Sequence, residues 1–365
     1  MDILNYFQFE AVGRRLEDLE TPVPVIDIGV VENNLRRWQA RCDKAGFANR
    51  PHIKTHKLAP LARAQVALGA RGVTVQKLGE AEAMAEAGID DMLLTFNIVG
   101  HHKLERLAEL MRRTAIQVLA DNEAVLAGLS HAAGAAGRDL SVMVECDTGA
   151  GRNGVQSPEA AVNLAQAIDR QPGLVFGGLM TLPKNGAREK MQHFLDAARH
   201  GLDRTGLGVP AVSTGGTPDM WKDDGLAEIS EYRAGTYIYN DRMQVAAGAA
   251  APGDCALSVL ATVVSVPTGE RAMTDAGSKA LTSDLLGLEG YGEVRALSGA
   301  QVYAMSEEHG FLDISKLNHK PKVGDLIRIT PNHVCPVTNL FDKVVFVSGE
   351  EVLGAVRVDA RGAVQ

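Results

Sequence analysis

The feature that most constrains the fold of this chain is a regular alternation of short β-branched runs with Ala-, Leu- and Glu-rich stretches between about residues 23 and 240. Strands that alternate with helices predict parallel βαβ units. A strand count near eight favours a (β/α)₈ barrel over a six-stranded doubly wound sheet. The strand candidates are residues 23–28, 51–54, 73–76, 92–96, 116–120, 141–146, 174–181, 211–214 and 228–233, and helical stretches between them include residues 31–45, 58–68, 81–87 and 158–168. The nine strand candidates exceed the eight strands of a barrel by one, and we expect the first candidate to lie outside the barrel.

The pattern changes after about residue 245. Residues 246–253 are rich in Gly, Ala and Pro and are typical of a linker. The β-type runs beyond it have no long helices between them and comprise residues 256–266, 293–296, 301–305, 326–330, 344–347 and 351–358. We therefore expect an α/β chain with a barrel over residues 23–245 and an antiparallel β domain over residues 246–365, with residues 1–22 packing against the latter.

Composition excludes several classes of protein. The 365 residues are 45% hydrophobic and 22% charged, as in a folded globular protein. A net charge of −8 argues against nucleic acid as the main partner and suits a small-molecule enzyme. We expect no membrane span, no signal peptide and a cytoplasmic location, because no long apolar run occurs in the sequence. The four cysteines form no CxxC pair, so reduced thiols are expected.

The first chemically informative segment is residues 50–57, RPHIKTHK, at the end of an early predicted strand. In a barrel, the carboxyl ends of the strands face the active site. A lysine buried there has its pKa lowered by desolvation and by neighbouring cations, which suits Schiff-base chemistry. Lys54 is therefore a candidate for covalent catalysis, and the alternative is a solvated basic loop.

Two further segments also follow predicted strands. Residues 147–154, DTGAGRNG, combine three glycines with Arg152, whose fork can bind an anionic oxygen. Residues 213–218, STGGTP, present adjacent glycines whose N–H groups suit a phosphate. Each segment is equally compatible with a plain turn that binds nothing.

The fourth segment is residues 332–335, NHVC, in the expected β domain. On an extended segment, side chains two positions apart project to the same face. His333 and Cys335 would then ligate one divalent ion, zinc most readily. The alternative is a buried cysteine beside a hydrogen-bonded histidine.

The combination of PHIKTHK at residues 51–57, DTGAGR at 147–152, DAGSKA at 275–280 and HVC at 333–335 resembles the D-threonine aldolases and D-serine dehydratases. These are metal-activated pyridoxal-phosphate (PLP) enzymes with the alanine-racemase-type fold. The resemblance runs over roughly residues 20–345. It implies a PLP-binding barrel followed by a β domain, usually in a homodimer with active sites near the subunit interface.

The resemblance also implies roles for individual residues. Lys54 corresponds to the catalytic lysine that forms the Schiff base with PLP, and His333 and Cys335 correspond to the metal ligands. The expected cofactor-binding residues are Lys54, Gln76, Arg152, Thr181, Thr214, Gly215, Gly216 and Tyr237, with the phosphate near residues 214–216 and 235–237. Arg233 stands where alanine racemases carry the arginine that faces the pyridine nitrogen, but that role is not assumed here.

This chain departs from the pattern of the family at two places, one that concerns the substrate and one that concerns the metal. Some relatives carry an aromatic residue or histidine where this chain reads MTL at residues 180–182. The second metal ligand in the group is Asp or Cys, so Cys335 allows zinc as well as manganese or magnesium.

Residues 275–280 and 332–340 look more like low-specificity D-threonine aldolases, which cleave D-3-hydroxy amino acids to glycine and an aldehyde. The alternatives are a D-serine or D-3-hydroxyaspartate dehydratase of the same family, an amino-acid racemase, and a non-catalytic PLP-binding protein.

Overall fold

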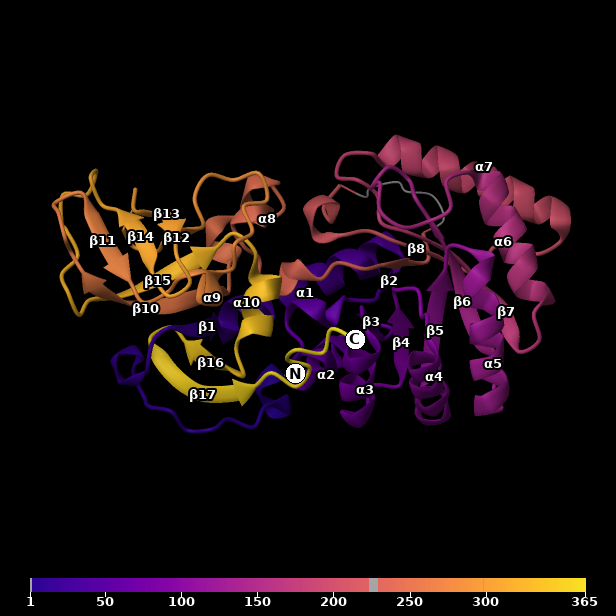
Figure 1. Cartoon of the computed structure of the whole chain (residues 1–365), viewed down its shortest axis with the longest axis horizontal. Coiled ribbons are helices and arrows are strands. Elements are labelled where there is room, and N and C mark those ends of the chain that lie inside the picture. Colours follow the sequence, from indigo (N-terminus) through magenta and orange to yellow (C-terminus); the bar gives the residue numbers. More distant parts are fainter. Residues whose placement is uncertain (1, 223–228, 298) are drawn as a thin grey trace. The chain divides into compact units, whose positions relative to one another are not determined.

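The computed structural model describes residues 2–222, 229–297 and 299–365, and the chain divides into two compact units (Figure 1). The barrel unit comprises Gln39–Lys54, Ala62–Gly235 and Ala363–Gln365. The β unit comprises Met1–Trp38, Thr55–Leu61 and Thr236–Gly362.

The barrel unit contains an eight-stranded parallel sheet in the order β2-β9-β8-β7-β6-β5-β4-β3. An isolated parallel bridge between His52 and Thr74 joins the ends of this order, and Thr74 N–H donates to Pro51 C=O at 2.8 Å. The sheet therefore closes on itself, which confirms the predicted (β/α)₈ class. Its strands are β2 (Ala48–Asn49), β3 (Val73–Val75), β4 (Asp91–Leu94), β5 (Ala115–Ala120), β6 (Leu140–Cys146), β7 (Leu174–Thr181), β8 (Val212–Thr214) and β9 (Glu231–Tyr232).

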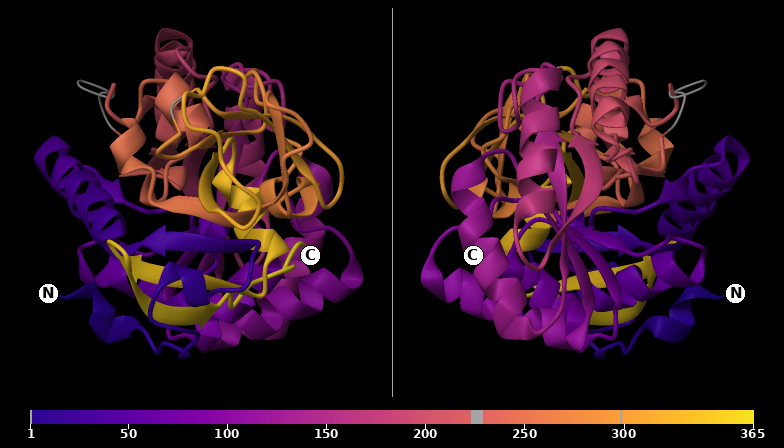
Figure 2. Two further views of the ribbon diagram at one scale, coloured as in Figure 1. Left: turned by 90° about the vertical axis from the view of Figure 1, so that its left-hand side faces the viewer. Right: turned by 90° about the vertical axis from the view of Figure 1, so that its right-hand side faces the viewer.

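Helices lie outside the barrel strands (Figure 2). Helix α6 (Pro158–Arg170) shows how the sequence sets them: the Ser157 side chain caps its first turn, and Pro158 stands where no helical N–H is needed. Its buried face recurs at helical spacing and packs against β6 and β7. The other helices are α1 (Ile28–Ala45) and α2 (Ala59–Ala67), which contribute to both units, and α3 (Leu78–Glu86), α4 (His101–Arg113), α5 (Leu126–Ala136) and α7 (Arg188–Thr205).

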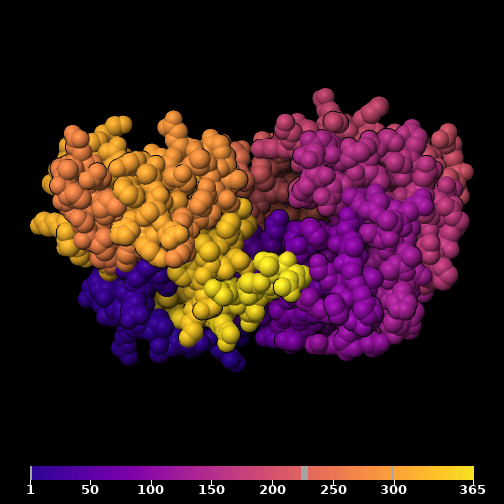
Figure 3. Space-filling model, viewed as in Figure 1, coloured from indigo at the N-terminus to yellow at the C-terminus, as the bar shows by residue number. Residues whose placement is uncertain are grey.

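The barrel interior is filled by apolar side chains from neighbouring strands. Leu93, Leu119, Met143 and Met180 form one buried cluster, at most 1% exposed. The barrel is therefore a packed core, and ligands must bind at its ends. On the outside of the same unit, the last residues of the chain lie at the surface (Figure 3), where Gly79 N–H donates to the Gln365 carbonyl at 3.1 Å.

The β unit contains a nine-stranded sheet in the order β11-β14-β13-β12-β15-β10-β1-β16-β17. An additional β10–β11 pairing closes six of these strands into a ring, and β1, β16 and β17 extend the sheet from β10. The pair β1–β16 is parallel and the others are antiparallel. The strands are β1 (Val23–Asp27), β10 (Leu257–Ser265), β11 (Arg271–Thr274), β12 (Gly292–Val294), β13 (Gln301–Met305), β14 (Gly310–Asp313), β15 (Leu326–Pro331), β16 (Lys343–Ser348) and β17 (Glu351–Arg357). The supernumerary first strand of the sequence pattern is thus β1, which belongs to this sheet.

Two local predictions are wrong. Residues 51–54 are not a strand, because pairing ends at the His52 bridge and Ile53–Thr55 form a 3₁₀ turn. Residues 332–335 are not one extended segment, because helix α10 (Val334–Leu340) begins directly after His333. The first turn of a helix tolerates a proline, and Pro336 lies there.

The predicted strand at residues 228–233 begins outside the described residues, and its described part contains β9. Among the residues that the structure describes, no helix combines the length and apolar character needed to cross a membrane.

Candidate active site

The barrel brings most of the predicted cofactor residues to one edge. Lys54 follows β2 on the 3₁₀ turn, Gln76 follows β3, and Arg152 lies in the loop after β6. Thr181 and Thr214 end β7 and β8. Because all eight strands run in parallel, these positions meet at the carboxyl end of the barrel.

His52 connects two of these positions. Its Nδ1 accepts the backbone N–H of Lys54 at 3.4 Å, so its proton is on Nε2, which lies 3.1 Å from Gln76 Oε1. Gln76 Nε2 in turn donates to the Thr95 carbonyl at 2.8 Å. The Gln76 side chain therefore orients the histidine that supports the Lys54 backbone. His52 belongs to the motif at residues 50–57, but the sequence spacing does not predict its contact with Gln76.

The site is rich in positive charge. Burial holds the pKa of His52 well below its ordinary value, and the charges of Lys54, Arg233 and Arg152 lower it further. His52 is therefore neutral at pH 7. Three cations that act on one buried ring form an environment suited to an anionic ligand.

Glu145 is the buried carboxylate beside these cations. It is 2% exposed, and its Oε1 lies 3.6 Å from Arg152 Nη2. Burial raises the pKa of Glu145, against the opposing effect of Arg152. Its Oε2 has no hydrogen-bond partner among the described residues. Arg152 itself is half exposed, so its planar fork is accessible to a ligand.

Arg233 and Thr181 are held by the protein itself. Arg233 Nε donates to Ser213 Oγ at 2.8 Å and its Nη2 to the Thr181 carbonyl at 2.6 Å. Burial lowers the pKa of Arg233 to about 10. The Thr181 hydroxyl lies 2.7 Å from that of Thr148. These bonds fix the mouth of the barrel between β7 and β8.

The predicted phosphate turn has two glycines with different constraints. Gly215 has a φ of +95°, and an added Cβ would lie 2.3–2.5 Å from ring atoms of Tyr232. At Gly216, the nearest atom to an added Cβ is Leu182 Cδ1 at 3.5 Å, an ordinary contact. The Tyr232 hydroxyl donates to the Gly216 carbonyl at 3.0 Å and fixes the turn.

A cavity of about 280 Å³ lies beside this turn. Its lining includes two cationic side chains, Arg188 and Lys222, and one acidic side chain, Asp219. Asp219 Oδ1 lies 3.3 Å from Lys222 Nζ. The lining residues are Pro183, Gly186, Arg188, Met191, Thr214, Gly215, Asp219, Lys222 and Tyr232. A glycine turn beside two cations is chemically suited to a phosphate group.

The predicted metal ligands lie together in the β unit. His333 precedes the first residue of α10 and Cys335 lies in its first turn. Cys335 Sγ lies 3.1 Å from Thr55 Oγ1 and 3.7 Å from Thr236 Oγ1. Thr55 is the residue directly after Lys54 in the sequence.

Acidic groups surround His333. Its Nδ1 lies 2.6 Å from Asp284 Oδ2. Burial lowers the pKa of His333, but Cys335, Asp284 and Asp241 outweigh it and raise that pKa to about 9. Within the described part of the chain, no three or more His, Cys, Asp and Glu side chains are arranged to hold a metal ion. His333 and Cys335 as a pair of metal ligands therefore stay a prediction.

Tyr237, the last predicted cofactor residue, belongs to the β unit. It lies on the 3₁₀ turn Thr236–Ile238, is 2% exposed, and its ring centroid lies 6.1 Å from that of Trp38. Its predicted contact with a phosphate stays a prediction.

The chain matches two family models, that of the alanine racemase N-terminal domain over residues 26–243 and that of a serine dehydratase domain over residues 256–347. It is 34% identical to a D-threonine aldolase of Arthrobacter sp over 363 residues, which cover 96% of this chain and 95% of that relative. The chain belongs to the D-threonine aldolase and D-serine dehydratase family.

Other members agree with this assignment. A D-threo-3-hydroxyaspartate dehydratase of Delftia sp. (strain HT23) is 33% identical, over 87% of this chain and 91% of that relative. The crystal structure of D-threonine aldolase from Filomicrobium marinum has a TM-score of 0.91 at 31% identity, over 98% of this chain and 100% of the other. An alanine racemase of Clostridium difficile 630 shares the fold, with a TM-score of 0.68 at 14% identity.

The family consists of PLP-dependent enzymes, and the relatives named aldolase and dehydratase are lyases; this chain is accordingly a lyase. The residues present fit both groups. The cationic barrel mouth and the Gly215 turn suit an anionic phosphorylated cofactor, and the imidazole–thiol pair suits a divalent ion.

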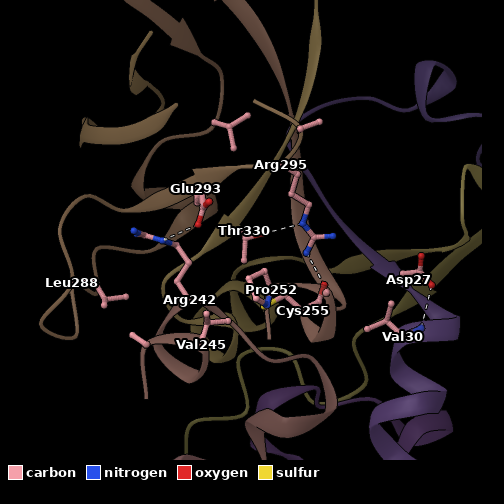
Figure 4. A pocket seen from close by; sticks show the side chains of 14 residues that line it. Asp27, Val30, Arg242, Val245, Pro252, Cys255, Leu288, Glu293, Arg295 and Thr330 are labelled. Carbon is pink, nitrogen blue, oxygen red and sulfur yellow. Dashed lines mark hydrogen bonds and ion pairs between the residues drawn. The ribbon is translucent and has the colours of Figure 1, made fainter. Parts of the chain in front are cut away.

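A second cavity, of about 680 Å³, lies within the β unit (Figure 4). Arg295 is fixed there by Thr330 Oγ1 at 2.9 Å and the Cys255 carbonyl at 2.7 Å, and Arg242 lies beside Glu293. None of the predicted site residues lines it. No sequence motif marks this cavity, because its lining comes from separate segments between residues 27 and 330.

Proposed function

We propose that the chain is a PLP- and divalent-metal-dependent lyase of the D-threonine aldolase type, which cleaves D-3-hydroxy amino acids to glycine and an aldehyde. The observation that carries this proposal is the 3.1 Å contact between Cys335 Sγ and Thr55 Oγ1, the neighbour of Lys54 in the chain. It ties the metal pair to the residue next to the cofactor lysine. The D-threonine aldolase relatives, at 31% and 34% identity over nearly the whole chain, support this choice of reaction.

In this proposal the barrel unit holds the cofactor. Lys54 would bind it covalently, Arg152 would donate to its phenolic oxygen, and the turn at residues 214–216 would hold the phosphate. PLP supplies an electron sink for the bond that breaks at the substrate Cα. His52 stays neutral and orients the Lys54 backbone, so it adds no further cation to the site.

His333 and Cys335 would hold the metal. A divalent ion supplies a Lewis acid for the 3-hydroxyl of the substrate. Nitrogen and sulfur ligands favour zinc over manganese and magnesium. The two protein ligands leave positions for the substrate hydroxyl and for water.

The second candidate activity is dehydration of D-serine or D-3-hydroxyaspartate to ammonia and a 2-oxo acid. The specific observation in its favour is the Delftia relative named D-threo-3-hydroxyaspartate dehydratase, at 33% identity. The same lysine and metal pair serve both reactions. The outcome depends on which bond at Cα the site holds perpendicular to the cofactor plane.

A product assay separates the two activities. The holoenzyme is incubated with D-threonine, D-serine and D-3-hydroxyaspartate, with and without added metal, and glycine and 2-oxo acid are both measured. Metal-dependent glycine formation from D-threonine supports the aldolase. Formation of 2-oxo acid without glycine contradicts it and supports the dehydratase.

A further inference from the structure

One carboxylate outside the predicted ligand set contacts the metal pair. Asp284 lies between α9 (Ser278–Leu281) and β12, and its Oδ2 is 2.6 Å from Nδ1 of His333. The two residues are 49 positions apart in the sequence. The side chain of His333 is 26% exposed and that of Asp284 is 42% exposed, so the pair is partly shielded from water.

We propose that Asp284 is a positioning residue for the metal site, an inference that rests on the proposed function. Its carboxylate accepts the Nδ1 proton of His333, which leaves Nε2 as the nitrogen that can bind the ion. An imidazole has two nitrogens, and the partner of one decides which is available to a metal. A carboxylate partner also orients the ring and makes it a more basic ligand.

The loop that carries Asp284 is fastened to the neighbour of His333. Asn332 Nδ2 donates to the Asp284 carbonyl at 3.0 Å and to the Gly290 carbonyl at 2.8 Å. Asp284 N–H donates to Thr282 Oγ1 at 3.2 Å. Both the ligand and its carboxylate partner are therefore fixed with respect to residue 332, so their separation is determined by the fold.

The DAGSKA motif explains how the loop reaches this place. An added Cβ at Gly277 would lie 2.4 Å from the carbonyl oxygens of Ser306 and Glu307, so only glycine allows this approach. The N–H groups of Ser278 and Lys279 donate to the same two carbonyls, at 2.9 and 3.1 Å. The motif thus attaches α9 to the turn between β13 and β14. Asp284 follows α9 after two residues in the sequence.

Asp275, the first residue of the motif, adds a second attachment. Its Oδ1 accepts the Thr262 N–H at 2.8 Å, and its Oδ2 accepts the Thr21 hydroxyl at 2.5 Å. Its carboxylate is therefore occupied by bonds to β10 and to the residues before β1. The motif carries the resemblance to the family, and its role here is to place Asp284 beside His333.

Asp241, the other acid near His333, has a different role. Its Oδ1 accepts the Gln244 N–H at 3.0 Å and its Oδ2 the Val334 N–H at 3.1 Å. It caps α8 (Arg242–Ala246) and holds the start of α10. Asp284 is therefore the acid whose side chain contacts the imidazole directly.

The test is metal binding, measured apart from activity. The PLP-loaded, metal-free parent, Asp284→Asn and Asp284→Ala are titrated with Zn²⁺ in a calorimeter and with Co²⁺ in a spectrophotometer. Asp342→Asn is the matched control, because Asp342 is an exposed acid of the same unit that pairs with Arg361 at 3.2 Å. His333→Ala reports whether the measured site is the proposed one.

We expect Asp284→Ala to weaken metal binding about 10- to 100-fold. Asp284→Asn should lie between the parent and Asp284→Ala, since an amide oxygen still accepts the proton but carries no charge. Asp342→Asn should bind like the parent. At saturating Co²⁺, all three variants should keep the thiolate charge-transfer band of the parent, because the ligands are unchanged.

Parental affinity in both Asp284 variants would overturn the positioning role and leave the proposed function intact. A Co²⁺ spectrum at saturation that shows a lost ligand in Asp284→Asn would make Asp284 a ligand and also overturn it. A parent that binds no metal, or His333→Ala that binds as the parent does, would instead remove the metal site of the proposed function. Should Asp284→Ala not fold by circular dichroism, the nearly isosteric Asp284→Asn decides.

Discussion

The mouth of the barrel unit and the metal pair of the β unit acquire their functional residues in different ways. At the barrel mouth, parallel strands deliver one residue each to a common edge, so topology alone gathers Lys54, Gln76 and Arg152. In the β unit, His333 and Cys335 are two positions apart in sequence, and His333 contacts Asp284 of a loop 49 positions away. The first site is positioned by the fold class and the second by particular contacts.

The two regions also differ in how their polar groups are satisfied. His52, Thr181 and Arg233 at the barrel mouth are held by short bonds to other side chains or carbonyls of the same unit. His333 contacts the Asp284 carboxylate and Cys335 the Thr55 hydroxyl, and both side chains are only partly buried. We therefore expect His52, Thr181 and Arg233 to tolerate substitution poorly, and the metal pair to lose its ion without loss of fold.

The largest expected effect is that of Lys54→Ala. Loss of the covalent attachment should reduce turnover at least on the order of a thousandfold, and the absorbance of bound cofactor should change. Borohydride reduction followed by peptide mapping checks the assignment. Lys343→Ala, at an exposed lysine that pairs with Glu10, should leave both properties unchanged. Cofactor trapped on another lysine would contradict the role of Lys54.

His333→Ala tests the other side of the comparison. We expect turnover to fall to the level of the metal-free enzyme and added metal not to restore it, because one of two protein ligands is missing. The melting temperature should stay within a few degrees of the parent, since the His333 side chain is partly exposed. Unfolding of the variant at ordinary temperature would make the pair structural.

Two neighbouring glycines give a sharper contrast within the barrel unit. Gly215→Ala should destabilise the fold by about 1–3 kcal/mol, because the new Cβ overlaps Tyr232 and the φ is positive. Gly216→Ala has room for its Cβ, so it should fold normally and weaken only cofactor binding. Denaturant titration and cofactor titration of both variants measure the two effects. Parental cofactor affinity in Gly216→Ala would remove this residue from the phosphate site.

The smallest expected effect is that of Arg152→Lys. A charge-assisted hydrogen bond contributes about 1.5–3 kcal/mol, so turnover should fall on the order of tenfold to hundredfold. A lysine cannot reproduce the planar fork. Stability should hardly change, because the Arg152 side chain is half exposed. Steady-state kinetics and the cofactor spectrum together check this, and an unchanged spectrum with unchanged turnover would exclude contact with the cofactor.

The sequence predicts the barrel well because hydrophobic alternation determines which residues form strands, and strand ends locate the mouth. It predicts the β unit less completely. Strands β11 and β14, of four residues each, form only in long-range pairing with each other and with β10 and β13. The sequence does not predict helix α10, because its β-branched residues and Pro336 are untypical of a helix. Its start is fixed instead by a hydrogen bond from the Val334 N–H to Asp241.

Local sequence patterns do not predict which side chains contact the site residues. The Asp284–His333 and Gln76–His52 contacts join residues 49 and 24 positions apart. No periodicity or motif spacing encodes such distances. The sequence therefore identifies the candidate ligands and the cofactor lysine, whereas the residues that orient them are found only in the fold.

The most direct test of the account is glycine formation from D-threonine by the holoenzyme before and after exhaustive chelation, with cofactor absorbance and melting temperature recorded on the same samples. We predict that chelation abolishes cleavage, that the cofactor absorbance and melting temperature stay nearly unchanged, and that a divalent metal restores activity. Full turnover after chelation, or loss of the fold with the metal, would contradict a catalytic ion held by His333 and Cys335.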